Sequence, residues 1–247
     1  RLVRDFGVQF VSFQDDEFMA HKDRVLEFCA ARNRRFPELR WSCTGRANLV
    51  DDETVAKMRA SGCCSISYGF ESGSPRMLKG MKKAITIEQM ERAVTINRRH
   101  GLPIPVSFIL GMPGEDEASC QETVDFCIRN NLHLGSLMFA TPYPGTSLFQ
   151  FALETGRIRQ DNLHDFVMSL GDARTFLINL TDTFTDEALQ AKYTWMQEEV
   201  RRHYRPLPPQ EIEARIQALY GPLAEDFCRL SPEDKAHRAK HGAIDLF

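Results

Sequence analysis

Two patterns of apolar and polar residues alternate along the first part of the chain. In one pattern, apolar residues stand at every second position or in a short continuous run, as in β-strands. It covers residues 8–13, 41–45, 63–70, 104–110 and 134–140. In the other pattern, apolar residues recur three and four positions apart, as on one face of an α-helix. It covers residues 22–34, 51–62, 86–101 and 119–130. Predicted strands therefore alternate with predicted helices.

Residues that begin or end helices agree with this assignment. Gly7 is placed to end a short helix before the first strand, and Asp51 or Asp52 to begin the helix after the second. Thr86 and Gln89 have the spacing of a capping box, in which each side chain accepts a hydrogen bond from the other residue's backbone N–H. These helix ends are predicted from side-chain chemistry alone.

The connections between the predicted strands are too long for hairpins, so they are crossovers and the strands are parallel. Right-handed crossovers curl five strands toward a barrel without closing it. We therefore expect an α/β fold, a partial (β/α) barrel of parallel strands with a C-terminal helical tail. Its functional groups belong at the carboxyl ends of the strands. The expected organisation is a partial barrel in residues 1–147, a helical extension in 148–205 and, beyond the prolines near position 206, a short helical or polar tail in 206–247.

Composition narrows the class of protein only moderately. A hydrophobic fraction of 43% is ordinary for a globular domain, and a net charge of -3 supplies no basic field for nucleic acid. No apolar run approaches the roughly 20 residues that cross a bilayer, so we expect no membrane partner and a cytoplasmic location. The seven cysteines, an odd number without a regular framework, indicate reduced thiols. Because the chain opens on Arg1 and enters a strand almost at once, we expect it to be part of a longer protein.

Acidic residues follow the first predicted strand. Asp15, Asp16 and Glu17 could bind a divalent metal, act as acid and base, or hold an ammonium group of a ligand. They could equally begin the next helix, whose N-terminal dipole favours carboxylates. No histidine or further carboxylate lies at ligand spacing, so a metal site is the weaker alternative.

A second carboxylate, Glu71, ends the strand 63–70 between two glycines that permit close approach of a ligand, as in recognition of a sugar hydroxyl. The alternatives are a solvated loop acid or an ion pair with Arg76. The turn from Gly111 to Glu115 comes before a helix, an arrangement that presents backbone N–H groups to a polar ligand. Three nearby lysines could meet a phosphate or carboxylate, or form a solvated face: Lys79, Lys82 and Lys83.

Other residues with metal-binding chemistry have structural interpretations. None of the cysteines forms a C-x-x-C or a four-ligand spacing, so we expect buried, inert thiols. His237 and His241 are four residues apart, which suits a metal, but they stand among lysine and arginine residues in a polar stretch and indicate a solvated helix. The sequence therefore predicts no metal ligands and leaves the catalytic residues unassigned.

Four motifs in order resemble the radical S-adenosylmethionine (SAM) superfamily. They are Phe-Gln-Asp-Asp-Glu-Phe (13–18), Gly-Phe-Glu-Ser-Gly-Ser (69–74), Phe-Ile-Leu-Gly-Met-Pro-Gly-Glu (108–115) and Ala-Thr-Pro-Tyr-Pro-Gly-Thr (140–146). More narrowly, they look like the branch with methylthiotransferases, elongator-type acetyltransferases and cobalamin-domain enzymes. Two departures are Asp-Asp-Glu in place of Gly-Gly-Glu, and Ser107 where that family often has glycine.

The resemblance implies cofactor contacts at matching positions. The acidic strand exit, Asp15 to Glu17, would hold the methionine amino group, and Glu71 with Ser72 would reach the ribose. The stretch around Ile109 to Gly111 would pack on the adenine. The last strand exit would contact it through backbone at Phe139, Ala140 and Thr141.

The resemblance also implies a 4Fe-4S cluster held by C-x-x-x-C-x-x-C, a motif that these 247 residues lack. Since residues 8–13 match the family's second strand, we expect the first strand and the cysteines upstream of Arg1. The implied activity is reductive cleavage of SAM to start radical chemistry such as methylation or methylthiolation, with a donor protein for the electron and, through a separate domain, cobalamin. The fragment alone is expected to be inactive. The alternative is a catalytically empty barrel that binds a ligand or a protein.

Overall fold

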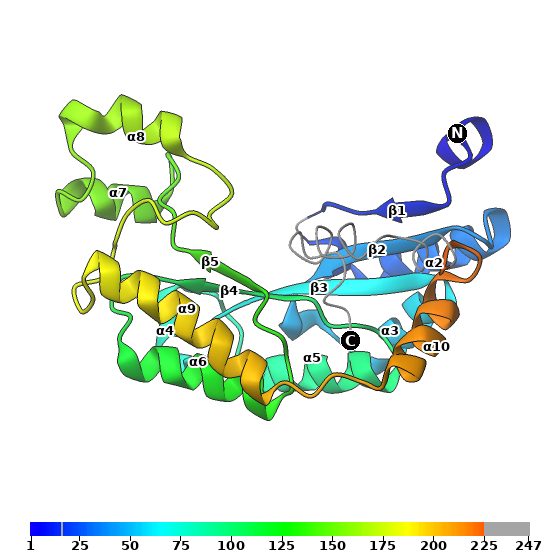
Figure 1. The fold of residues 1–247 in the computed structure, drawn as a ribbon. Helices are drawn as coiled ribbons and strands as arrows, with labels where there is room; N and C mark the ends of the chain where they lie inside the picture. Colours follow the sequence, from blue (N-terminus) through cyan, green and yellow to red (C-terminus); the bar gives the residue numbers. More distant parts are fainter. Residues whose placement is uncertain (16, 225–247) are drawn as a thin grey trace. The chain divides into compact units, whose positions relative to one another are not determined.

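The computed structural model describes residues 1–15 and 17–224 (Figure 1). Its strands are β1 (Phe10–Ser12), β2 (Arg40–Gly45), β3 (Cys63–Glu71), β4 (Val106–Leu110) and β5 (Ser136–Phe139). They follow one another across one sheet in sequence order, and β1–β2, β2–β3 and β4–β5 pair in parallel. The α/β partial barrel predicted from the alternation is confirmed. Strand β1 is shorter than the predicted stretch 8–13.

The chain divides into two compact units. Unit 1 comprises Arg1–Phe70, Ile85–Val106 and Arg205–Phe247, and unit 2 comprises Glu71–Ala84 and Ser107–Tyr204. The residues at the strand exits are therefore distributed over both units.

Unit 1 holds helices α1 (Leu2–Phe6), α2 (Lys22–Arg35), α3 (Asp52–Ala60), α5 (Ile87–Arg99) and α10 (Pro209–Tyr220). One face of β2 is buried, with Trp41 at 0% and Cys43 at 3% exposure. The Trp41 indole Nε1 donates to Ser61 O at 2.7 Å, so this large core side chain has its polar atom satisfied. Helix α1 ends at Gly7, whose φ of 63° is the left-handed conformation that favours glycine.

Helix α5 begins with the predicted capping box, which is confirmed. Gln89 N donates to Thr86 Oγ1 at 3.3 Å, and Thr86 N donates to Gln89 Oε1 at 3.0 Å. Two backbone donors at the start of the helix are thereby satisfied.

Removing this cap is expected to cost a measurable part of the stability. We expect Thr86→Ala to lower the free energy of unfolding by about 1 kcal/mol, because an N-terminal donor of α5 loses its acceptor. Urea denaturation measures the change. Thr95→Ala, on the same helix, is the control, because the exposed Thr95 hydroxyl bonds back to Glu91 O within the helix. Equal losses in the two variants would contradict the capping role.

Helix α10 starts at Pro209, in the proline-rich stretch that the sequence marks as a linker. Proline suits the first helical position because a backbone N–H there would have no intrahelical partner, so its absence costs nothing. The far end of α10 packs on the rest of unit 1: Cys64 Sγ and Arg59 Nη2 donate to carbonyls of the last turn at 3.2 and 2.9 Å, and Tyr220 stacks on Phe10. Residues distant in sequence thus complete this unit.

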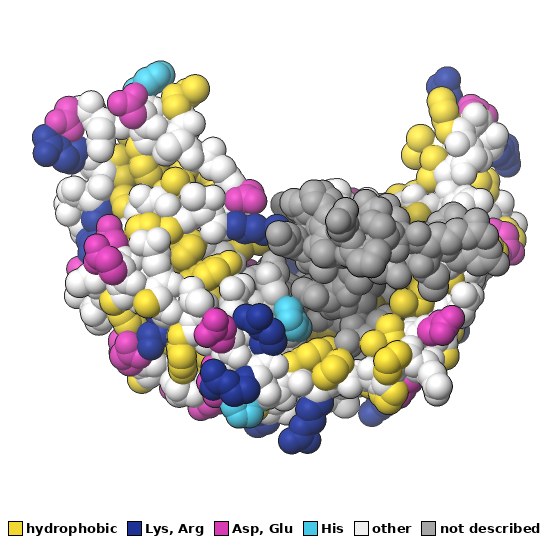
Figure 2. All heavy atoms as spheres, viewed as in Figure 1, with side chains coloured by type: hydrophobic (Ala, Val, Ile, Leu, Met, Phe, Trp, Pro, Cys, Tyr) yellow, Lys and Arg dark blue, Asp and Glu magenta, His cyan; other side chains and the backbone are white. Residues whose placement is uncertain are grey.

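Unit 2 holds α4 (Pro75–Gly80), α6 (Glu117–Arg129), α7 (Ser147–Glu154), α8 (Leu163–Ser169) and α9 (Asp186–His203). Helices α7 and α8 share a small core built on Ala152, Ile158 and Leu180. Hydrophobic atoms reach the surface of this part (Figure 2), where Met168 of α8 is 72% exposed.

The outer edge of β5 is covered by groups from the C-terminal part of unit 2. Tyr193 Oη of α9 donates to Leu137 O at 3.2 Å, and Phe139 N donates to Ala173 O at 2.7 Å. Backbone groups at this edge are therefore paired without a further strand, which removes a template for strand addition. No helix in residues 1–15 and 17–224 is long and apolar enough to cross a membrane.

Candidate functional site

In unit 2 the exits of β4 and β5 lie side by side. Their registered pairs run to Leu110 opposite Phe139, and Ala140 N continues the ladder by donating to Leu110 O at 2.8 Å. Gly111 and Thr141 are the next residues of the two strands. The structure therefore brings together two of the stretches for which cofactor contacts are predicted.

Glu71, the last residue of β3, has an unusual backbone conformation. Its φ is 64°, in the left-handed region where a residue with a Cβ is strained by about 1 kcal/mol. Its side chain is 17% exposed, and Oε1 accepts a hydrogen bond from Lys83 Nζ at 2.6 Å. Among the described residues nothing donates to Oε2. The carboxylate is thus oriented and keeps one oxygen for a hydroxyl donor.

Lys83 is the partner of Glu71, and the alternative of an ion pair between Glu71 and Arg76 is wrong. Arg76 instead donates to Gly114 O at 2.6 Å and to Asp116 at 2.7 Å. Lys83 follows α4 in a turn where Lys82 also has a positive φ, of 54°. Of the three lysines, Lys83 therefore contacts a carboxylate rather than forming part of a solvated face. Its position in the segment after Glu71 could have indicated this pairing.

Ser72 and Gly73 fasten the strand exit to α6. Ser72 is fully buried, and its hydroxyl lies 3.2 Å from Thr123 Oγ1 and accepts from Ser74 N at 3.1 Å. Gly73 N also donates to Thr123 Oγ1, at 3.0 Å. Ser72 is engaged within the protein, and its contact with a ribose stays a prediction.

The turn after β4 folds around the carboxylate of Glu115. Gly111 N and Met112 N donate to Glu115 Oε2 at 2.5 and 3.1 Å. The expectation that this turn presents N–H groups to a ligand is therefore wrong for these two residues. Glu115 is 1% exposed, and burial raises its pKa to about 7. The Thr183 hydroxyl donates to Glu115 O and ties the turn to the chain before α9.

The side chains around the β5 exit point to two sides of the sheet. Phe139 faces α9, with its ring 4.7 Å from that of Tyr193 and 5.3 Å from that of Phe176. Ile109 stands in register with Met138, on the other face of the ladder from the buried residues of both strands. An adenine on Ile109 would also lie near Met138. The four motifs do not indicate this role for Met138, but the alternation of the two faces along each strand does.

Thr141 is half-buried, and its hydroxyl donates to Phe139 O at 3.1 Å. Its backbone N–H has no hydrogen-bond partner in the described part of the chain. Ala140 is 5% exposed and belongs to the small core that α7 and α8 share, with Ile109 packed against it. The contacts predicted for Phe139, Ala140 and Thr141 through their backbone stay predictions.

In unit 1, Asp15 and Glu17 are exposed at the exit of β1, and Asp16 lies outside the described residues. Glu17 Oε1 accepts from Arg46 Nη1 at 2.5 Å. Glu17 is the N-cap of a short 3-10 helix, η1 (Phe18–Ala20), without a side-chain hydrogen bond to it, and α2 starts later, at Lys22 after His21. Arg46 directly follows β2. It is a candidate ligand-binding residue that sequence reasoning missed, although its place at the end of a strand could have identified it.

The cysteines do not fit an iron–sulfur cluster. The six described ones are free and buried, as predicted, and burial raises the thiol pKa of several of them: Cys29, Cys63, Cys64, Cys120 and Cys127. Cluster ligation needs thiolates. No group of three potential metal ligands occurs in residues 1–15 and 17–224. The two histidines with metal spacing, His237 and His241, and the seventh cysteine, Cys228, lie outside the described residues.

Comparison with known protein families assigns the chain to one of them. The sequence profile of the Radical SAM superfamily matches residues 1–127, more than half of the 247 residues. The chain belongs to the radical SAM superfamily. The resemblance in the four motifs is thereby confirmed at the level of the family, whose cofactors are SAM and a 4Fe-4S cluster.

Relatives of this radical SAM chain include enzymes with different reactions. An uncharacterised methyltransferase of Pyrococcus horikoshii is 30% identical over 149 residues, 60% of this chain and 32% of that protein. An anaerobic magnesium-protoporphyrin IX monomethyl ester cyclase of Cereibacter sphaeroides is 24% identical over 216 residues, 83% of this chain and 35% of the cyclase. The chain thus spans about a third of the length of these relatives.

Among solved structures, the radical SAM methyltransferase TsrM from Kitasatospora setae, with cobalamin and a 4Fe-4S cluster bound, has a similar fold. The TM-score is 0.57 at 18% identity, over 84% of this chain and 44% of TsrM. At this identity the likeness concerns the fold alone.

Proposed function

We propose that this chain binds SAM at its strand exits, as the cofactor-binding part of a radical SAM enzyme that transfers a group such as methyl or methylthio. The observation that carries the proposal is Glu71. Its strained conformation and its ion pair with Lys83 orient one carboxylate oxygen without satisfying the other. Strained residues persist where the surroundings over-determine them, and they cluster at functional sites.

Each part of SAM has a matching group in one of the units. Glu71 accepts a ribose hydroxyl, Ile109 and Met138 offer an apolar surface to the adenine, and the backbone at Phe139–Thr141 meets the edge of the base. In unit 1, Glu17 and Arg46 together complement the ammonium and carboxylate of the methionine, with Asp15 and Asp16 as further acceptors. A zwitterion needs both signs of charge, which this ion pair supplies.

Methyl transfer is supported by the relative named as a methyltransferase, and the cyclase shows that similar sequences serve other reactions. The described cysteines do not fit the cluster, so its ligands are not among them. The proposed enzyme also uses an electron-donor protein, and cobalamin bound in a separate domain. A cytoplasmic location accords with the free thiols of all six described cysteines.

Binding of S-adenosylhomocysteine by the chain tests this function, because this ligand carries the adenosine, ammonium and carboxylate groups that the proposed site contacts. We expect Glu71→Gln to weaken binding about tenfold, because a neutral amide oxygen is a poorer acceptor for a ribose hydroxyl than a carboxylate. Isothermal titration calorimetry measures the affinity. Glu154→Gln on α7 is the control, because Glu154 is exposed and accepts a hydrogen bond from Gln150 on the same helix. Unchanged affinity in Glu71→Gln removes the role of Glu71, and no binding by the unsubstituted chain removes the proposed function.

A further inference from the structure

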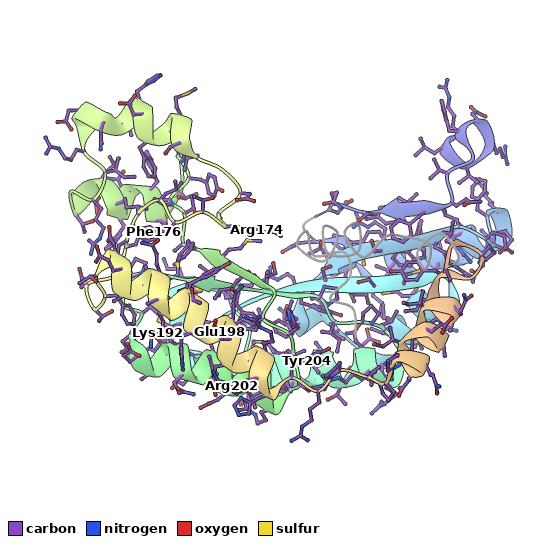
Figure 3. The ribbon with its side chains drawn as sticks, viewed as in Figure 1. Arg174, Phe176, Lys192, Glu198, Arg202 and Tyr204 are labelled. Carbon is purple, nitrogen blue, oxygen red and sulfur yellow. The ribbon has the colours of Figure 1, made fainter. Side chains whose placement is uncertain are left out.

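The segment after α8 is attached to the β5 exit at three points. Tyr143 Oη donates to Gly171 O at 2.6 Å, and Phe139 N donates to Ala173 O at 2.7 Å. The ring of Phe176, labelled in Figure 3, lies 5.3 Å from that of Phe139. The attachments fall on both sides of Thr141, so this segment fixes the backbone from Phe139 to Tyr143.

Tyr143 is held at its backbone as well as at its hydroxyl. It stands between Pro142 and Pro144, whose rings fix φ. Its carbonyl accepts from Thr146 Oγ1 at 2.7 Å and from Thr146 N at 3.2 Å. Tyr143 is nevertheless 40% exposed, so its hydroxyl bond does more for the position of the loop than for the core.

The attached segment has a constrained conformation of its own. Ala173 has a φ of 62°, and Arg174 N donates to Asp172 Oδ1 at 3.1 Å. A non-glycine residue stays in this region only where neighbouring contacts hold it. The segment also follows residues 1–127, which match the family. The chain thus uses a part outside the matched region to hold the end of β5.

We propose that Tyr143 is a positioning residue for recognition of adenine, acting through the Thr141 backbone. The inference rests on the proposed SAM site. A backbone donor and acceptor distinguish the 6-amino group of adenine from a 6-oxo group only if they cannot rotate or shift. The bond from Tyr143 to Gly171 supplies that restraint, and the unpartnered Thr141 N–H is one of the groups restrained.

The test compares two ligands that differ at this position, S-adenosylhomocysteine and its 6-oxo analogue S-inosylhomocysteine. Calorimetry on the 247-residue chain gives the ratio of the two affinities. The unsubstituted chain is expected to prefer adenine by about tenfold, the effect of one satisfied hydrogen bond replaced by an unfavourable contact. Tyr143→Phe keeps the ring and removes the hydroxyl, and we expect it to reduce this preference about threefold or more.

Tyr193→Phe is the matched control. It removes a tyrosine hydroxyl that donates to a backbone carbonyl, as that of Tyr143 does, but the carbonyl is Leu137 O of β5, before the exit. We expect this variant to keep the preference for adenine. Phe176→Leu, which loosens the same segment without altering Tyr143, is expected to reduce the preference as Tyr143→Phe does. Melting temperatures of all variants establish that they fold.

The outcomes separate this inference from the proposed function. An unchanged preference in Tyr143→Phe overturns the positioning role while the SAM site stands. Equal reductions in Tyr143→Phe and Tyr193→Phe overturn it too, because they indicate general loosening of β5. Failure of the unsubstituted chain to bind S-adenosylhomocysteine overturns the proposed function first.

Discussion

Replacing Glu115 by Gln is expected to remove about 3 kcal/mol of pH dependence from the stability of the protein. Burial raises the Glu115 pKa to about 7 from its ordinary value of 4.5, and each pKa unit corresponds to about 1.4 kcal/mol. The unfolded chain releases this proton near pH 4.5 and the folded protein near pH 7. The contribution of Glu115 to the free energy of unfolding is therefore fully present below pH 4.5 and is lost as the pH rises through 7.

Glutamine has nearly the same shape and no proton to release in this range. Its amide oxygen can still accept from Gly111 N and Met112 N, so we expect Glu115→Gln to fold. Urea denaturation of both proteins at pH 5 and pH 7.5 gives the difference in the free energy of unfolding. Part of the Glu115 contribution is already lost at pH 5, so this difference should shift by about 2.5 kcal/mol in favour of Gln from pH 5 to pH 7.5.

Glu117→Gln is the matched control, because Glu117 lies two residues away and is 70% exposed in its ion pair with Lys192. We expect no comparable shift for it. A stability difference between Glu115→Gln and the unsubstituted protein that is the same at both pH values would contradict the raised pKa of Glu115.

Gly73→Ala is expected to lower the free energy of unfolding by about 2–3 kcal/mol. A Cβ at this position would lie 2.6 Å from Thr123 Cα and 2.8 Å from Glu122 O, both of which belong to the backbone of α6. Backbone cannot turn aside as a flexible side chain can, so the strand exit and α6 must separate. The bond from Gly73 N to Thr123 Oγ1 is then lost as well.

Chemical denaturation measures this loss, and binding of S-adenosylhomocysteine reports its effect on the neighbouring Glu71. The control is Gly80→Ala at the end of α4, where a Cβ meets nothing within 4 Å. In a helix, alanine is favoured over glycine by up to about 1 kcal/mol, so this control is expected to be neutral or stabilising. A loss of less than about 0.5 kcal/mol in Gly73→Ala would show that α6 can adjust.

Local features of the chain are predicted well from the sequence because they depend on neighbouring residues. The capping box of Thr86 and Gln89, the Asp51 cap of α3 and the left-handed end of α1 at Gly7 each join residues no more than a few positions apart. The burial alternation along β2 likewise follows from strand geometry. Stretches with these signals have nearly the bounds that their patterns predict.

Partners of charged residues are predicted less well. Glu71 has basic residues at Arg76 and Lys83 in the following segment, and sequence favours the nearer one. The choice of Lys83 depends on the positive φ of Glu71 and on the turn after α4, where Lys82 and Ala84 are also left-handed. Non-glycine residues rarely take this conformation, so sequence rules do not predict it.

By itself, the sequence determined the alternation of strands and helices, the parallel partial barrel, the acids at strand exits and the ordered motifs of the radical SAM superfamily. Tertiary structure alone decided which of those groups are engaged: Glu115 fills the turn after β4, Arg46 pairs with Glu17, and Tyr143 reaches Gly171 across 28 positions of chain. The reason is physical. Periodicity and capping arise between neighbours in sequence, whereas hydrogen bonds between distant segments exist only after packing has brought those segments together.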